Sequence, residues 1–265
     1  MEIEIRQAFE RLIRRPHGII LISGPTGSGK STTMYAALQQ INSIDRHIIT
    51  VEDPVEYQLP GVNQVQVDSE YGITFAAALR SIVRHDPDVI MVGEIRDQET
   101  HLALEASLTG HLVFATVHTN SAVGAITRLL DMGCEPYLIS AAMLGLLAQR
   151  LVRRICSNCT KPIVANTTER QLLEIPSERG PVEIFRGEGC SRCGRSGYYE
   201  RVGVYEFVAF DSGLSELVMQ KAATEQLHRH AVAQGAITLR SDAIQKVLHG
   251  LTTLEEAVRI TANEL

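Results

Sequence analysis

The 265-residue sequence lacks any apolar run approaching the roughly 18 residues needed to span a bilayer, and no secretory signal sequence is recognisable at its start. It also lacks an excess of positive charge. Its formal net charge of −6 gives no overall attraction to nucleic acid or acidic lipid. We find no internal repeat and no low-complexity segment. These absences disfavour membrane-spanning proteins and nucleic-acid motors, and we expect a cytosolic protein.

Cysteine is also scarce, but its distribution is informative. Four of the five cysteines form two C-x-x-C pairs. In a reducing compartment such pairs indicate metal or redox chemistry rather than structural disulfides. The fifth, Cys134, stands alone and is expected to be buried as a small apolar side chain. Apolar residues make up 45% of the chain, so it can bury a substantial core.

What the sequence does contain is a glycine-rich loop between an apolar run, 18–23, and a helix-like segment, 32–39. This order is typical of a phosphate-binding P-loop; the alternative is a glycine-rich turn before an ordinary helix. Glycines allow N–H groups to converge on an anion at the helix N-terminus. Lys30 can reach the β and γ phosphates, and the Ser31 hydroxyl can ligate Mg²⁺. The predicted nucleotide-binding residues here are Gly24, Pro25, Thr26, Gly27, Ser28, Gly29, Lys30, Ser31 and Thr32.

A β-branched run at 47–51 predicts a strand that delivers acids at its carboxyl end, namely Glu52, Asp53 and Glu56. Ligands of open α/β sheets bind outside the carboxyl ends of strands, so these acids are candidate ligands of a bound nucleotide. The alternative is an acidic turn with solvated side chains.

A second apolar run ends in Gly93 and Glu94 and resembles a Walker B strand, whose carboxylate reaches Mg²⁺ or the attacking water. Glycine here replaces the usual metal-holding aspartate. We therefore expect the acids at 52–56 to share that duty.

Two histidines, His111 and His118, bracket the next predicted strand. Their odd separation directs them to opposite faces of a regular strand, so they are not expected to bind one metal together. A histidine at a strand end is either a satisfied polar residue or a nucleotide contact.

Helical periodicity predicts further helices, and β-type alternation predicts a half-exposed strand at 62–67. A capping-box pattern at 253–256 predicts a helix start near the C-terminus. The predicted helices span 1–15, 74–85, 97–108 and 141–155.

The two cysteine pairs lie thirty residues apart and can supply four thiolates to a structural zinc ion: Cys156, Cys159, Cys190 and Cys193. A redox pair is the alternative for a single C-x-x-C. The spacer is longer than that of common zinc ribbons, so 166–179 is expected to form an inserted loop or helix. Nearby arginines are surface charge or, alternatively, a docking patch.

Taken together, these motifs resemble the ATPases of bacterial type II secretion and type IV pilus assembly. The resemblance runs along nearly the whole chain and rests on the cysteine pairs and on four stretches: RPHGIILISGPTGSGKSTT (15–33), ITVEDPVEY (49–57), DPDVIMVGEIRD (86–97) and TGHLVFATVHTNSA (109–122). The tetracysteine module favours the secretion and pilus-assembly branch over retraction ATPases, which lack it.

This resemblance implies a RecA-like core in a homo-hexameric ring that hydrolyses ATP, with Mg²⁺, to move an inner-membrane platform protein. Carried onto this chain, it makes Glu56 the candidate general base and Glu94 the Walker B acid. It makes His118 a catalytic residue and His111 a nucleotide contact. In the family an N-terminal domain supplies arginines and docks the membrane partner, and we expect nearly all of that domain to lie outside this sequence. We therefore expect the isolated chain to bind nucleotide but to hydrolyse it poorly.

We predict an α/β protein with a RecA-like P-loop core at 1–152, a four-cysteine zinc subdomain at 153–203 and a mainly helical C-terminal region at 204–265. The expected function is an ATPase that drives type II secretion pseudopilus assembly from the cytoplasmic side of the inner membrane, or alternatively type IV pilus assembly. A zinc-containing P-loop protein acting on nucleic acid and a non-hydrolysing nucleotide-dependent scaffold are the other readings. The acidic charge, and the lack of interleaved aromatic and basic residues between the cysteine pairs, count against nucleic acid.

Overall fold

The structure, a computed structural model, describes residues 1–176 and 178–262, so small parts of the predicted zinc subdomain and C-terminal region lie outside it. The described residues form two compact units. The larger combines 2–149 with 206–236, and the smaller combines 150–205 with the segment from 237 onward. The segment predicted at 204–265 is therefore divided between the two units.

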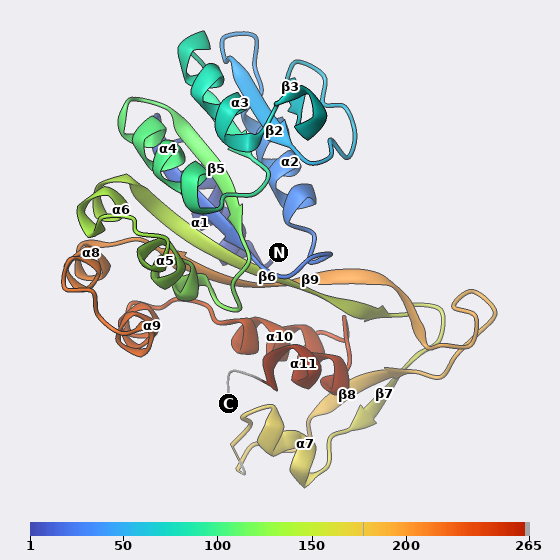
Figure 1. Cartoon of the computed structure of the whole chain (residues 1–265). Helices are drawn as coiled ribbons and strands as arrows, with labels where there is room; N and C mark the ends of the chain where they lie inside the picture. The colour runs from blue at the N-terminus through green and yellow to red at the C-terminus, as the bar shows by residue number, and fades with distance from the viewer. Residues whose placement is uncertain (177, 263–265) are drawn as a thin grey trace. The chain divides into compact units, whose positions relative to one another are not determined.

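The larger unit is built on a mainly parallel sheet. Within the described residues its strand order is β3-β2-β4-β5-β1-β6-β9 (Figure 1). All pairs from β3 to β6 along this order are parallel, which gives the α/β architecture predicted from the motifs. The strands are β1 (Gly18–Ser23), β2 (Ile48–Glu52), β3 (Asn63–Gln66), β4 (Val89–Val92), β5 (Leu112–Val117), β6 (Met143–Ile155) and β9 (Tyr198–Ala209). Only the parts of β6 up to 149 and of β9 from 206 belong to the larger unit.

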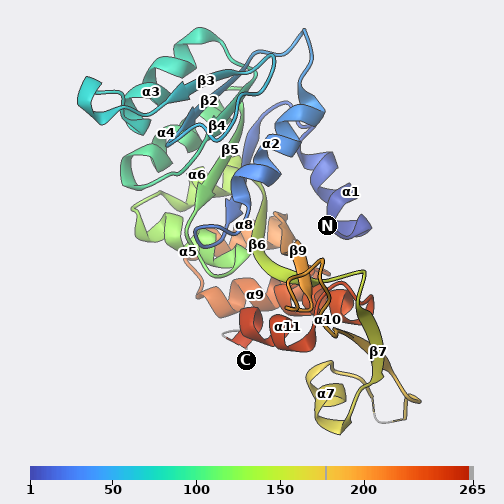
Figure 2. The same ribbon diagram turned by 90° about the vertical axis from the view of Figure 1, so that its right-hand side faces the viewer.

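Helices cover both faces of this sheet. Figure 2 shows α1 and α2 on one face and α3, α4 and α6 on the other. Every residue of β1, β4 and β5 is buried, as expected for central parallel strands covered on both sides. The helical elements of this unit are α1 (Ile3–Leu12), α2 (Lys30–Ile41), η1 (Ser69–Tyr71), α3 (Phe75–Ile82), η2 (Val83–His85), α4 (Asp97–Leu108), α5 (Ala122–Asp131), α6 (Pro136–Ala142), α8 (Ser212–Met219) and α9 (Thr224–Ala233).

The prediction of a helix at 141–155 is wrong. Helix α6 ends at Ala142, and the following residues form β6, which pairs in parallel with β1. A continuous apolar run is compatible with a buried strand as well as a buried helix, so periodicity did not separate the two. Gly145 was the available signal, because a Cβ there would lie 2.5 Å from Leu12 Cδ1 and 3.2 Å from the Val208 carbonyl oxygen.

Among its described residues, the smaller unit contains an antiparallel ribbon and three helices. Strands β7 (Thr160–Val164) and β8 (Glu183–Gly187) pair antiparallel. Between them lies α7 (Thr167–Leu172), which confirms the predicted insertion and begins with a capping box of Asn166 and Glu169. Helix α10 (Leu239–Leu248) packs against both α11 (Leu254–Thr261) and β8. The predicted helix start at 253–256 is confirmed, since the Thr253 side chain accepts from the Glu256 N–H.

A buried carboxylate joins α11 to β6 within this unit. Glu256 accepts from the Arg153 N–H at 2.8 Å and from the guanidinium groups of Arg153 (3.1 Å) and Arg259 (2.9 Å). Its side chain is only 3% exposed. Burial alone would raise the pKa of Glu256, but the hydrogen bonds from Arg259 and Arg153 outweigh it and lower the pKa to about 2.

We expect Glu256→Gln to lower the free energy of unfolding by about 3 kcal/mol near neutral pH, because a neutral amide cannot make the charge-assisted hydrogen bonds that the buried carboxylate accepts from Arg153 and Arg259. A pKa depressed in the folded state gives stability that is present above the unfolded value of about 4.3 and is lost as the pH falls toward 2. Urea unfolding followed by circular dichroism measures this difference. It should shrink steadily between about pH 5 and pH 2.

Glu255→Gln is the matched control. The Glu255 side chain is 63% exposed and forms an exposed ion pair with Arg186, so this variant should unfold like the parent chain. A Glu256→Gln penalty that stays the same at every pH would contradict the role given to the charged carboxylate.

Candidate functional site

The glycine-rich loop joins β1 directly to α2. Gly27 and Gly29 have φ values of 76° and 87°, which lie in the left-handed region that favours glycine. The Lys30 ammonium bends back over the loop and donates to the carbonyl oxygens of Gly24 (2.8 Å) and Pro25 (3.1 Å). No side chain caps the N-terminus of α2, which leaves the first-turn N–H groups available to an anion.

The remaining predicted loop residues occupy positions around this cradle. The Ser28 hydroxyl is buried and has no hydrogen-bond partner in the part of the chain that the structure describes. Among the described residues, no other buried side-chain nitrogen or oxygen atom lacks one. Ser31 lies half-buried in the first turn of α2, where its hydroxyl could ligate a metal. Thr26 and Thr32 are exposed.

Strand register brings the acidic and histidine motifs to the same edge as this loop. Ser23, the last residue of β1, pairs with Val117 of β5. Glu94 follows β4 and His118 follows β5, and the His118 Nε2 lies 3.6 Å from a Glu94 carboxylate oxygen. Two residues predicted from separate motifs are therefore neighbours at the carboxyl ends of the strands, where α/β proteins bind ligands.

Arg96 is a residue of this edge that sequence reasoning missed. Its guanidinium donates to both oxygens of Glu94, from Nε at 3.2 Å and from Nη2 at 3.1 Å. The hydrogen bonds and charge of Glu94, with a smaller contribution from Asp53, raise the pKa of Arg96. The sequence feature that could have identified Arg96 is its position two residues after Glu94. Arg96 holds the Glu94 carboxylate in place and keeps a positive charge beside it.

The glycine that replaces the usual aspartate at the end of β4 is explained by packing. The N–H of Gly93 donates to the Val51 carbonyl at 2.8 Å, and its own carbonyl accepts from the Thr116 hydroxyl at 2.5 Å. A Cβ at this position would lie 3.2 Å from the Val51 oxygen and 3.4 Å from the Glu52 Cα. A larger residue here would require the β2 backbone to shift by a few tenths of an ångström.

The three acids after β2 do not form one cluster of open ligands. Asp53 and Glu56 are exposed, whereas Glu52 is 3% exposed. Among the described residues, the Glu56 carboxylate has no hydrogen-bond or ion-pair partner, which leaves it able to act on a bound ligand.

The Glu52 carboxylate instead accepts hydrogen bonds from three side chains of the protein. Thr50 Oγ1 donates to its Oε1 at 2.6 Å and Gln64 Nε2 donates at 3.1 Å, while the hydroxyl of Tyr35 donates to its Oε2. Burial, together with the hydrogen bond to Glu52, raises the pKa of Tyr35, so the phenol stays protonated. We therefore correct the expectation that Glu52 is an open nucleotide ligand, because its carboxylate organises the protein interior.

His111 is not brought to this edge. It precedes β5 at the level of Gly18, the first residue of β1, and its carbonyl accepts from the Gly18 N–H at 3.1 Å. The imidazole Nδ1 lies 2.8 Å from the Ala106 carbonyl oxygen. A six-residue strand separates it from the P-loop edge by roughly 20 Å. The expected contact between His111 and a nucleotide on the same chain is therefore corrected: this histidine caps local turns.

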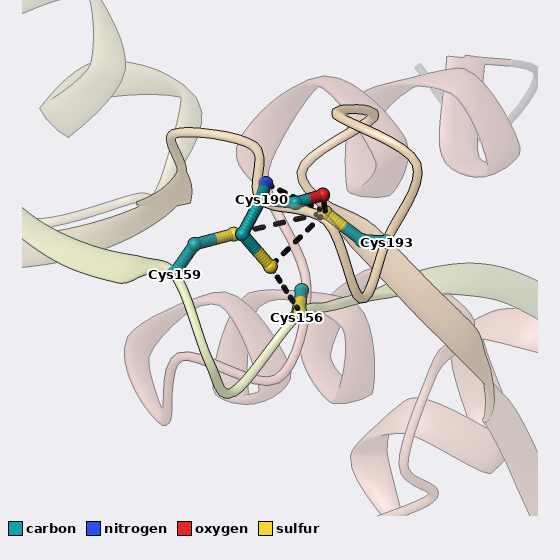
Figure 3. Close-up of side chains that lie close together, drawn as sticks. All are labelled: Cys156, Cys159, Cys190 and Cys193. Atoms are coloured by element: carbon teal, nitrogen blue, oxygen red, sulfur yellow. Dashed lines mark hydrogen bonds between the residues drawn. The ribbon is translucent and has the colours of Figure 1, made fainter.

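The four paired cysteines converge in the smaller unit (Figure 3). Their sulfur atoms all lie within 4.8 Å of one another. The measured separations are 3.9 Å for Cys156–Cys190, 3.9 Å for Cys159–Cys193 and 3.7 Å for Cys190–Cys193. A tetrahedron of thiolates around zinc, with Zn–S bonds of about 2.3 Å, has edges of about 3.8 Å. The cluster therefore has the dimensions of a tetrahedral metal site.

Backbone N–H groups point at two of these sulfurs. The Gly189 N–H donates to Cys159 Sγ at 3.3 Å from a backbone with φ of 92°, a conformation that favours glycine. The Cys190 N–H donates to Cys193 Sγ at 3.2 Å and lowers the pKa of Cys193 to about 6. The Asn158 amide lowers the pKa of Cys190. Desolvation raises the pKa of Cys159, so a cation is needed to hold all four as thiolates.

The chain is similar to known proteins along nearly its whole length. A family model described as "Type II/IV secretion system protein" matches residues 1–259. The chain is 51% identical over 254 residues to "Type II secretion system ATPase E" of Vibrio cholerae serotype O1, which covers 96% of this chain and 50% of that protein. It is 47% identical over 258 residues to "Type IV pilus assembly ATPase PilB" of Myxococcus xanthus, covering 96% of this chain and 45% of that protein.

A solved structure has the same fold. The pilus retraction motor PilT with bound ADP matches with a TM-score of 0.72 and 32% identity, over 97% of this chain and 65% of that one. The chain spans about half the length of the curated relatives it matches.

Proposed function

The chain belongs to the type II/IV secretion system protein family, and we propose that it carries the ATP-binding and ATP-hydrolysing machinery of a motor that powers type II secretion pseudopilus assembly. The observation that carries this proposal is the meeting of three motifs at one sheet edge. Lys30 in the P-loop, Glu94 after β4 and His118 after β5 all lie at the carboxyl ends of parallel strands. This arrangement suits a nucleoside triphosphate whose γ phosphate faces the acids.

The proposed chemistry divides among a few side chains. Lys30 and the first-turn N–H groups of α2 bind the phosphates and offset their charge. Ser31 would hold Mg²⁺, with Glu94 close to it, and the bound ion would supply further positive charge to the phosphates. Glu56, exposed and without a partner among the described residues, positions the attacking water and accepts its proton. His118 lies beside Glu94, with its Nε2 3.6 Å from the carboxylate, and would face the γ phosphate there.

Type IV pilus assembly is the alternative function of the same site. The 47% identity to a pilus assembly ATPase is close to the 51% identity to a secretion ATPase, so similarity favours the secretion system only slightly. Expression of the motor in strains that lack either system's own ATPase, scored by secretion or by piliation, distinguishes them.

We further propose that the motor works as a homo-hexamer on the cytoplasmic face of the bacterial inner membrane. It would act there on platform proteins, with arginines supplied from an N-terminal domain. No helix among the described residues is long and apolar enough to cross a membrane. Solution mass measured with and without a non-hydrolysable ATP analogue tests ring formation. Fast turnover by the isolated chain that does not depend on its concentration would contradict a need for the ring.

Zinc is the metal proposed for the cysteine cluster. Four thiolates at tetrahedral spacing match a closed structural site and leave no position for water or substrate. The ion would hold the ends of β6, β7, β8 and β9 together.

The proposed hydrolysis is tested by Glu56→Gln. We expect the single-turnover rate of hydrolysis, at a saturating concentration of the chain, to fall about a hundredfold, because the amide cannot accept the proton of the attacking water. Nucleotide affinity should stay within about twofold of the parent value, since Lys30 and the loop N–H groups are unchanged. Phosphate release in single-turnover experiments, with the chain in excess over radiolabelled ATP, measures slow rates without requiring an assembled ring.

Glu70→Gln serves as the control, because Glu70 is an exposed acid in η1 with no place in the proposed machinery. Its turnover should equal that of the parent chain. If the Glu56→Gln variant hydrolyses ATP at the parent rate, Glu56 is not the base.

A further inference from the structure

The turn that carries Glu56 has no regular secondary structure, and side chains supply its hydrogen bonds. It runs from 53 to 59, between β2 and the edge strand β3. The N–H of Val55 donates to Gln66 Oε1 at 3.2 Å, and the N–H of Leu59 donates to Gln64 Oε1 at 2.7 Å. The Gln64 amide in turn donates to the Tyr57 carbonyl at 3.2 Å. Strand β3 therefore fixes both arms of the turn.

The Glu56 backbone itself is held from a different element. Tyr35 lies on α2 and is fully buried, and its hydroxyl accepts from the Glu56 N–H at 3.3 Å. The same hydroxyl donates to Glu52. The Tyr35 ring packs edge-on against Tyr57, with ring centroids 4.7 Å apart and planes at 83°. One phenol thus links the P-loop helix, the buried acid and the turn.

We propose that Tyr35 is a positioning residue that sets Glu56 relative to the phosphate cradle. The geometric reason is that α2 begins with Lys30 and reaches Tyr35 in little more than one turn. The helix that holds the phosphates therefore also holds the backbone of the residue that would act on the attacking water. This inference rests on the proposed ATP hydrolysis and assigns a part of that site to a residue outside its motifs.

Packing alone does not require the hydroxyl. Phenylalanine would fill the same buried space and keep the edge-on contact with Tyr57. It would leave the Glu52 carboxylate without one of its three donors and the Glu56 N–H without its acceptor. The hydroxyl is thus the group to test, and Tyr35→Phe removes only that group.

We expect Tyr35→Phe to lower single-turnover hydrolysis about tenfold, with the dissociation constant for Mg-ATP within about twofold of the parent value. Fluorescent ATP analogues report binding, and phosphate release reports hydrolysis. Amide hydrogen exchange should quicken in the peptide containing Glu56, because its N–H loses the Tyr35 acceptor. Tyr71→Phe is the matched control, since Tyr71 is 82% exposed and should change none of these values.

A double variant separates positioning from general structural support. If Tyr35 acts through Glu56, Tyr35→Phe should cause almost no further loss of hydrolysis in a Glu56→Gln background. A tenfold loss in both backgrounds, or parent-like hydrolysis by Tyr35→Phe in a chain where Glu56→Gln is impaired, overturns this inference alone. A chain in which Glu56→Gln has no effect overturns the proposed base and this inference together. Circular dichroism and the thermal midpoint verify that each variant is folded.

Discussion

Replacing Lys30 with alanine is expected to weaken Mg-ATP binding by at least about a hundredfold and to leave no measurable hydrolysis. The ammonium is the fixed positive charge of the P-loop, and it lies directly over the loop, 2.8 Å from the Gly24 carbonyl. A triphosphate that enters the cradle must draw Lys30 away from these carbonyls. The ammonium exchanges two neutral carbonyl acceptors for anionic phosphate oxygens, and the Coulomb attraction between opposite charges makes the new contacts stronger.

The Lys30→Ala substitution also changes the P-loop when no nucleotide is bound. Without the amine, the carbonyls of Gly24 and Pro25 lose a shared donor, so the loop loses order as well as charge. Lys30→Arg separates these effects. Arginine keeps the charge, but its planar fork does not fit a cradle shaped for a compact ammonium, so we expect hydrolysis to remain lost while binding partly recovers.

Titration with a fluorescent ATP analogue measures the affinity, and Lys161→Ala supplies the control. Lys161 is a 60%-exposed lysine whose ion pair with Glu188 is equally exposed, so its loss should leave both affinity and stability unchanged. A Lys30→Ala chain that is folded and still binds Mg-ATP with parent affinity would contradict the assignment of the loop as the phosphate site.

Much of the nucleotide site was predictable because its motifs are local and their order fixes their place. The P-loop, Glu94 and His118 each follow an apolar run, and parallel strands deliver the residues that follow them to one edge. The same rule explains His111. His111 precedes β5, so it lies at the opposite edge of the sheet from His118. The odd number of residues between the two histidines indicates which face each occupies but not which edge.

The parts that could not be predicted depend on which neighbour a side chain meets. Glu52 and Glu56 are four residues apart in one acidic stretch, yet one is buried and the other exposed. That difference arises from Tyr35 and Gln64, which come from other elements and carry no motif. The apolar run that forms β6 was ambiguous for the same reason, since its pairing with β1 decided its conformation.

The division of the C-terminal region also depends on tertiary contacts. Residues 206–236 belong to the larger unit, and the segment from 237 belongs with the cysteines. In the smaller unit the Ile155 N–H donates to the Leu251 carbonyl at 3.0 Å, and Arg153 binds Glu256. Helices with ordinary apolar stripes gave no indication of these partners, because periodicity shows which face is buried but not against what.

Removal of the metal is the second large effect that we expect. Freshly purified, reduced protein should contain one zinc ion per chain, and replacing all four paired cysteines with serine should unfold the smaller unit. The described part of this unit has a short ribbon and three helices, and the cluster ties the ends of its strands together. Without the ion, thiolates held 3.7 to 3.9 Å apart would repel, and protonation would relieve that repulsion at the cost of the tetrahedral geometry.

The two units make this prediction specific. Hydrogen exchange should rise across residues 150–205 and in α10 and α11, whereas β1, β4 and β5 of the larger unit should stay protected, because their burial does not involve the cysteines. Cys134→Ala is the control: Cys134 is a lone buried thiol whose pKa burial raises to about 11, and it is no part of the cluster. Absence of zinc from reduced protein, or an undisturbed smaller unit after all four replacements, would overturn the site. Mg-ATP binding that survives in the four-serine chain would show that the phosphate cradle forms without the metal, as expected if the loop depends only on β1 and α2.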